Sequence, residues 1–180
     1  MSTTPAAAPA PGPVPTPLAR AAAVPVPPAD SLAGRFPLTP NPSAADDAAR
    51  ARALKDLHFG SVFTDHMAHA RWTRDGGWGE RGIIPFGDLS LSPAAAVLHY
   101  GQEIFEGIKA YRHDDGGVWT FRPRYNAARL AASARRLALP ELPEEDFIAS
   151  LVDLVRADEA WVPDGEGEVE IGRASCRERV

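Results

Sequence analysis

The sequence predicts a small mixed α/β domain, of the α+β kind, and three features of its central part indicate this fold class. Short runs rich in β-branched and aromatic residues alternate with Gly-containing turns, which is typical of strands and hairpins. Two later segments begin at a proline and carry helix-forming residues or an apolar stripe with helical spacing. With 180 residues, of which 44% are apolar and 24% charged, the chain is long enough for one such domain.

The first part of the chain is expected to form a disordered arm, covering residues 1–45. Twelve of the 18 prolines lie in it, interleaved with Ala, Ser and Thr, and large apolar side chains are few. A segment of this kind buries too little apolar surface to offset the entropy lost on ordering. We therefore place the folded domain at residues 46–169.

The elements of this domain are expected in the order strand, helix, hairpin, helix, helix. A strand is expected over 59–72, with a turn at 75–77. Ser92 and Pro93 have the features of an N-cap and a first helical residue, which predicts a helix to about Phe105. The remaining elements are a hairpin of 108–113 with 118–122, a helix over 123–139 and a helix after Pro143.

Charge and composition exclude several function classes. The net charge of -5 disfavours partners that attract an excess of Lys and Arg, namely nucleic acid and anionic membrane surfaces. The chain has no apolar run long enough to cross a bilayer and no secretory signal, so we expect a cytoplasmic protein. Cys176 is the only cysteine, which excludes an intrachain disulfide and a Cys-ligated zinc site. Small molecules and other proteins remain as partners.

Two groups of polar residues could carry chemistry. Asp65, His66 and His69 suggest a metal site, but on a strand the two histidines point to opposite faces, so we expect no metal here. Arg129 lies in the first part of an Ala-rich helix, where its planar guanidinium could bind a phosphate. Judged alone, however, an arginine on such a helix is more often solvated, and we assign Arg124 and Arg135 to the solvated face.

The last segment, residues 170–180, differs in composition from the rest of the chain. It has no apolar periodicity and contains three arginines. Residues 171–180 match, residue for residue, one reading frame of a common sequencing-adapter oligonucleotide. We therefore expect adapter read-through here instead of native sequence, and a natural gene that continues beyond this point; a genuine basic tail is the alternative.

Several segments together carry a family resemblance. In chain order they are 59–67 (FGSVFTDHM), 89–93 (LSLSP), 99–112 (HYGQEIFEGIKAYR), 121–123 (FRP) with Asn126 and Arg129, 139–140 (LP) and 161–163 (WVP). In order and spacing they resemble the N-terminal portion of the branched-chain amino-acid aminotransferases. This family belongs to fold type IV of the pyridoxal-phosphate enzymes, and the resemblance covers about residues 57–169.

The resemblance implies a cofactor, pyridoxal 5'-phosphate, and roles for four residues. It matches Arg129 to the arginine that holds the cofactor phosphate, and Phe59, Tyr100 and Phe105 to aromatic residues around the branched side chain of the substrate. The implied reaction transfers the amino group of Leu, Ile or Val to 2-oxoglutarate, within branched-chain amino-acid biosynthesis. A homodimer is implied for the full-length protein.

The catalytic lysine of the family has no match in this chain. Its only lysines are Lys55 and Lys109, and the family places the catalytic lysine in a later, larger domain. We therefore assign no catalytic residue and expect the chain as given to be inactive. The alternatives are a D-amino-acid aminotransferase or an aminodeoxychorismate lyase of the same fold, or a non-catalytic binding module.

Overall fold

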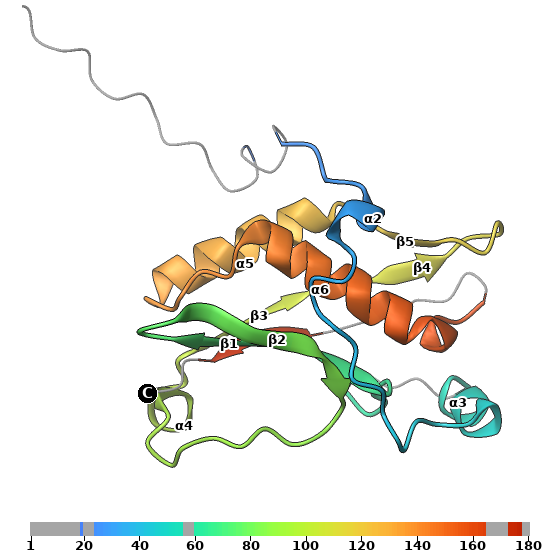
Figure 1. The fold of residues 1–180 in the computed structure, drawn as a ribbon, viewed down its shortest axis with the longest axis horizontal. Coiled ribbons are helices and arrows are strands. Elements are labelled where there is room, and N and C mark those ends of the chain that lie inside the picture. The colour runs from blue at the N-terminus through green and yellow to red at the C-terminus, as the bar shows by residue number, and fades with distance from the viewer. Residues whose placement is uncertain (1–18, 20–23, 56–59, 165–172, 178–180) are drawn as a thin grey trace, which may run out of the picture.

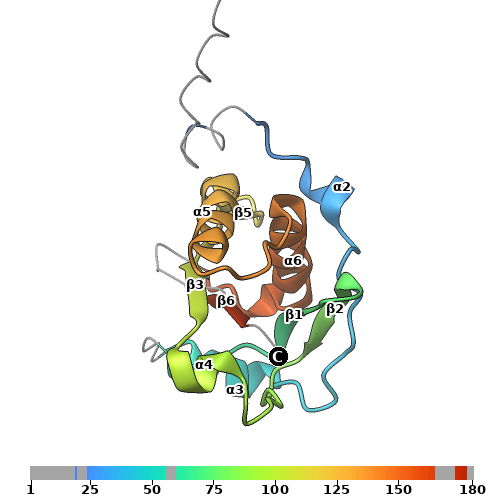
Figure 2. The same ribbon diagram turned by 90° about the vertical axis from the view of Figure 1, so that its left-hand side faces the viewer.

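Two long helices cover a layer of short strands in this protein (Figure 1). The computed structural model describes residues 19, 24–55, 60–164 and 173–177. Helix α5 (Pro123–Arg136) packs against helix α6 (Glu144–Ala157), and the two run side by side above the strands (Figure 2). Helix α5 contacts β3, whereas α6 contacts β1 and β2, so each helix covers its own set of strands.

The strands of the described residues form three separate antiparallel pairs, which makes the fold α+β. Strand β1 (His66–Thr73) pairs with β2 (Gly77–Pro85), and β4 (Ala110–Arg112) pairs with β5 (Val118–Thr120). Strand β3 (Glu103–Gly107) pairs with β6 (Arg173–Arg177). The predicted hairpin of β4 and β5 is confirmed, and its turn contains Gly116 at φ +79°, a backbone conformation that glycine adopts without strain.

Four shorter helices complete the described part of the chain. They are α2 (Ala29–Leu32), α3 (Asp47–Ala53), α4 (Ala96–Tyr100) and the 3-10 turn η1 (Glu159–Trp161). Among the described helices, none is both long and apolar enough to cross a lipid bilayer. The two long helices begin as predicted, α5 with Pro123 in its first turn and α6 directly after Pro143 with three acidic residues in its first turn.

The core lies between the two long helices and the strands beneath them. Helix α5 contributes small residues such as Ala127 and Ala134, which allow α6 to approach closely. Helix α6 contributes Phe147, Ile148 and Leu154 from its apolar face. Ile83 of β2 is fully buried in the same cluster, so the hairpin of β1 and β2 is held to the helix layer by apolar contact.

The expected disordered arm is wrong over residues 24–45. Leu32 and Phe36 from this segment are buried in the core, at 1% and 2% exposure. The carboxylate of Asp153 on α6 accepts hydrogen bonds from the backbone N–H of Gly34 (2.7 Å) and of Phe36 (2.9 Å). Proline density therefore did not prevent order, because two apolar anchors and one carboxylate hold the extended backbone. Residues 1–18 and 20–23 lie outside the described part.

Two further expectations on secondary structure need correction. The strand expected over 59–72 begins only at His66 and ends at Thr73. The helix expected from Pro93 to Phe105 is only α4. It begins at Ala96, with Ala95 and not Ser92 as its N-cap, and Gly101 ends it in the left-handed conformation (φ +58°). After Gly101 the chain becomes strand β3, in which Ile104 and Glu106 point inward and Phe105 points outward.

The C-terminal segment contributes one strand. Its residues Arg173–Arg177 form β6 on the edge of β3, although no periodicity in the sequence predicted a strand there. The pairing joins backbone groups, and backbone pairing depends little on side-chain identity. The expectation that this segment is adapter-derived stays a prediction.

Candidate functional site

The centre of the candidate site is an ion pair between helix α5 and strand β3. Arg129 on α5 donates through Nε to Oε2 of Glu106 on β3 (3.0 Å), and its Nη2 donates to Oε1 of the same carboxylate. Two parallel N–H bonds of this kind fix a guanidinium in orientation as well as in position. The arginine side chain is 56% exposed and the glutamate side chain only 8%, so the pair connects the interior to the surface.

Glu106 is held in place by further contacts from both elements. Its Oε1 accepts from the amide Nδ2 of Asn126 (3.1 Å) and from the backbone N–H of Gly107 (3.1 Å). The Asn126 amide also donates to the Gly107 carbonyl (2.8 Å). A buried carboxylate is costly unless it is paired and hydrogen-bonded, and here several donors converge on it.

The ion pair leaves Arg129 with unused donors. A guanidinium has five N–H groups, and Glu106 engages one on Nε and one on Nη2. Within the part of the chain that the structure describes, the Nη1 group has no protein partner. Because the side chain is more than half exposed, the remaining N–H groups are available to an anion with several oxygens, such as a phosphate.

Where the structure describes them, the aromatic residues expected at a substrate pocket are exposed at the surface. Tyr100, the last residue of α4, is 85% exposed, and Phe105 on β3 is 71% exposed. Strand alternation places Phe105 on the face of β3 opposite Glu106, and therefore away from the Glu106–Arg129 pair. Phe59, the third expected aromatic residue, lies outside the described residues.

The other basic residues of α5 behave in two different ways. Arg135 is 44% exposed in its side chain and pairs with Glu141 at the surface, as the solvated face predicts. The assignment of Arg124 to the solvated face is wrong, because this residue is only 6% exposed. It donates from Nη2 to the Pro25 carbonyl (2.9 Å), and its buried Nε has no partner in the described structure. The N-terminal segment covers it, which the disordered-arm expectation excluded.

The two lysines lie in connections between elements. Lys109 is half-buried between β3 and β4, and Lys55 is exposed just after α3. Two surface depressions of the described part are lined by other residues. One, of about 390 Å³, is lined mainly by charged residues between α5 and α6, including Arg35 and Arg135, and the other, of about 220 Å³, lies beside Phe36.

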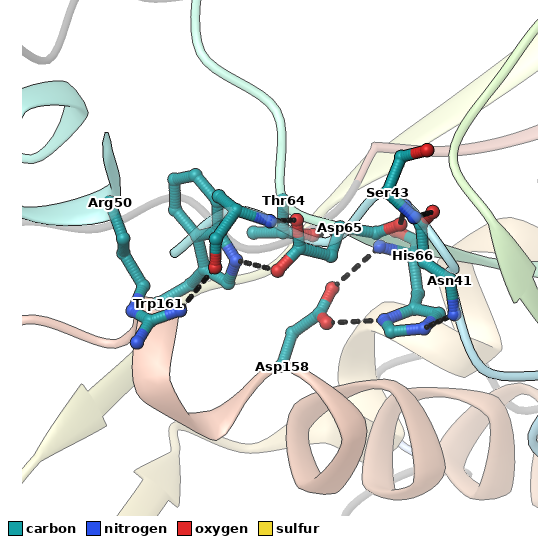
Figure 3. A network of polar contacts seen from close by, with 9 residues as sticks. Asn41, Ser43, Arg50, Thr64, Asp65, His66, Asp158 and Trp161 are labelled. Carbon is teal, nitrogen blue, oxygen red and sulfur yellow. Dashed lines mark hydrogen bonds and ion pairs between the residues drawn. The ribbon is translucent and has the colours of Figure 1, made fainter. Parts of the chain in front are cut away.

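A second polar cluster, around His66, was missed by the sequence reasoning (Figure 3). His66 Nδ1 lies 2.6 Å from Oδ1 of Asp158, and its backbone N–H donates to Oδ2 of the same residue (3.0 Å). The backbone N–H of Asn41 donates to His66 Nε2 (3.0 Å), so Nε2 is the unprotonated nitrogen and Nδ1 carries the hydrogen. Asp65 accepts from Ala45 N–H (2.8 Å) and from Trp161 Nε1 (2.7 Å).

The hydrogen-bonding groups of His66 in this second cluster are satisfied within the protein. Every ring nitrogen of His66 has a protein partner, and the residues that the structure describes contain no group of three or more potential metal ligands. The cluster joins the N-terminal segment to the end of α6, through residues far apart in the sequence. Its only signal in the sequence is the group Asp65, His66 and His69, which suggested a metal site.

Comparison with known proteins gives one consistent set of relatives. No family model matches the chain. The chain is 54% identical over 133 residues to the branched-chain-amino-acid aminotransferase of Mycolicibacterium smegmatis, an alignment that covers 74% of this chain and 36% of the relative. It is 51% identical over 124 residues to that of Mycobacterium tuberculosis, covering 69% and 34%.

A more distant relative agrees. The chain is 48% identical over 111 residues to branched-chain-amino-acid aminotransferase 2 of Bacillus subtilis, covering 62% of this chain and 31% of the relative. The chain thus spans about a third of the length of the curated relatives that it matches.

Proposed function

We propose that the chain belongs to the branched-chain-amino-acid aminotransferases and forms the small-domain part of an enzyme that transfers the amino group of Leu, Ile or Val to 2-oxoglutarate. The support is the identity of 48–54% to three relatives of that name. We propose pyridoxal 5'-phosphate as the cofactor. When bound, this group supplies an electron sink that allows the amino group to leave one carbon skeleton and join another.

The single observation that carries this proposal in the structure is the orientation of Arg129. A phosphate needs a cation with several N–H donors, held in one direction and open to solvent. Arg129 meets these requirements, because Glu106 fixes one edge of the guanidinium while 56% of the side chain stays exposed. The residues present therefore fit the phosphate end of the cofactor.

We assign the remaining roles as proposals. The exposed Tyr100 and Phe105, with Phe59, would face the branched side chain of the substrate, since apolar substrates need aromatic or aliphatic walls. The catalytic lysine would come from a part of the protein beyond this chain, so the chain alone should not transaminate. A cytoplasmic homodimer stays a prediction.

The test of the proposed function is Arg129→Ala in the full-length protein. Removing one partner of a charge-assisted bidentate pair costs on the order of 2 to 4 kcal/mol, which is roughly 30-fold to 1,000-fold in affinity. We expect a loss of that size in the affinity of the cofactor-free protein for pyridoxal phosphate, measured by absorbance titration.

The matched control is Arg135→Ala, on the same helix. Arg135 pairs with Glu141 at the surface, and exposed ion pairs contribute little, so the affinity of this variant should change by less than about threefold. Arg124 is unsuitable as a control, because it is buried. Equal losses in the two variants would show that Arg129 does not hold the phosphate.

A further inference from the structure

We propose that Glu106 is a positioning residue for the cofactor phosphate, acting through Arg129; this inference rests on the proposed function. Glu106 is not itself placed to touch a phosphate, since both of its oxygens face the guanidinium and the groups behind it. Its role is to hold Arg129 in one rotamer, with the same edge of the guanidinium always turned outward. The geometry assigns this role through the two N–H bonds from Nε and Nη2.

The physical basis is the conformational freedom of arginine. A free arginine side chain populates many rotamers, and fixing it when a ligand binds is entropically unfavourable. Here the ordering is already present in the folded chain. The Glu106 residue is 7% exposed and receives hydrogen bonds from Asn126 and Gly107, so it forms a rigid support for the arginine. A phosphate would then bind to donors that need little reorganisation.

The negative charge of Glu106 should weaken phosphate binding, whereas its positioning of Arg129 should strengthen it. This opposition makes the role testable. A carboxylate beside the phosphate-binding arginine repels a dianion and offsets part of the arginine charge. If Glu106 mattered only through its charge, neutralising it would strengthen phosphate binding. If it mattered by positioning, neutralising it would weaken binding. The two accounts predict changes of opposite sign in the same measurement.

The main variant is Glu106→Gln in the full-length protein, with Glu103→Gln as its matched control. The glutamine keeps the shape and one acceptor oxygen, but its NH2 group would oppose one of the two Arg129 donors, so the bidentate pair is lost. Glu103 lies on the same strand, on the outward face with Phe105. We expect Glu106→Gln to lower the affinity for pyridoxal phosphate about tenfold, and Glu103→Gln to change it by less than about threefold.

Two further measurements separate positioning from a general loss of structure. Affinity for pyridoxal, which lacks the phosphate, should be the same in Glu106→Gln and in the unaltered protein. In the Arg129→Ala background, Glu106→Gln should cause no additional loss, because a residue that acts through Arg129 has nothing left to position. If Glu106→Gln does not fold, Glu106→Asp serves instead, since it keeps the charge but withdraws the carboxylate by one methylene.

The experiment distinguishes a failure of the inference about Glu106 from a failure of the proposed function. If Arg129→Ala keeps full affinity, the phosphate role of Arg129 is wrong. If Arg129→Ala loses affinity while Glu106→Gln binds as tightly as the unaltered protein, or more tightly, the positioning role of Glu106 is wrong. An equal loss of affinity for pyridoxal and for pyridoxal phosphate would also overturn the positioning role. A residue that positions the phosphate-binding arginine cannot affect the binding of a molecule that has no phosphate.

Discussion

His66 joins the segment before α3 to the end of helix α6 through hydrogen bonds to Asn41 and Asp158. Its Nε2 accepts from the backbone of Asn41, near the N-terminus, and its Nδ1 lies against Asp158, at the end of α6. Because Nε2 accepts a hydrogen bond from Asn41, the ring hydrogen lies on Nδ1, facing Asp158. Asp158 is only 2% exposed, so this carboxylate depends on His66 for its partners.

The first prediction at this scale concerns Asp158→Asn. The substitution keeps one acceptor oxygen but replaces the other by an NH2 group, which would oppose one of the two N–H donors of His66 in a buried site. Leaving buried polar groups without partners costs on the order of 2 to 4 kcal/mol. We expect a loss of that size in the free energy of unfolding, measured by urea denaturation of the full-length protein.

The control for this substitution is Asp114→Asn, in the exposed turn between β4 and β5. Since Asp114 lies at the surface, its substitution should change stability by less than about 0.5 kcal/mol. A similar loss in both variants would mean that the His66 cluster does not stabilise the fold.

At the scale of elements, the N-terminal segment is held to helix α6 by three kinds of contact. Leu32 and Phe36 insert into the core, Asp153 accepts two backbone N–H bonds, and Arg35 pairs with Asp146 (3.3 Å). The segment also bonds to β2, through an N–H that donates from residue 39 to the carbonyl of residue 83 (2.8 Å). It therefore spans the helix layer and the strand layer, and should contribute to the stability of both.

The prediction for this element is that Leu32→Ala destabilises the protein strongly. Truncating a fully buried leucine removes apolar contact and leaves a cavity, at a cost of about 2 to 5 kcal/mol. Val26→Ala, in the same segment but 44% exposed, should cost less than about 1 kcal/mol. Thermal unfolding of the two variants measures this difference. Equal unfolding midpoints for the two variants would mean that Leu32 contributes no more to stability than Val26, as expected if this segment were a dispensable arm.

Local signals in the sequence predicted the elements with strong periodicity or fixed turn chemistry. Proline starts and an apolar stripe predicted α5 and α6, and a spacer of Asp and Gly predicted the β4–β5 hairpin. Part of strand β3 was expected as helix, because a five-residue alternation is a weak signal beside the Ser-Pro pair that predicted a helix start. Burial of Leu32 could not be predicted, since it depends on a helix more than 100 residues later.

The site was predictable only in part, for a similar reason. Arg129 was found because it lies within motifs whose spacing resembles a known family. Glu106, in the same set of motifs, was not singled out. Its pairing with Arg129 joins residues 23 positions apart and requires the inward face of β3 to meet one face of α5. A carboxylate in a strand gives no sign in sequence that it will be buried.

At the scale of the whole molecule, the described surface carries several large apolar side chains that are well exposed. Those more than half exposed are Leu38, Phe63, Leu98, Tyr100, Phe105, Trp119 and Phe121. Single exposed apolar residues are common, but exposed aromatic residues on neighbouring elements favour association with other surfaces. The relatives are about three times the length over which this chain aligns, which fits the proposal that another part of the protein covers some of these side chains.

The last prediction follows from this exposure: the 180-residue chain, produced alone, should self-associate. Burying an aromatic side chain against a second copy removes apolar surface from water, at about 25 cal/mol per Å². Sedimentation velocity should therefore give a mass that rises with protein concentration. Replacing Tyr100 and Phe105 together by Ser should shift this rise to higher concentration. Replacing Val24 and Val26 by Ser, which are also exposed but smaller, should shift it less. A monomer at every concentration, with a cooperative melt, would contradict the prediction, because it would show that these exposed aromatic side chains do not cause self-association.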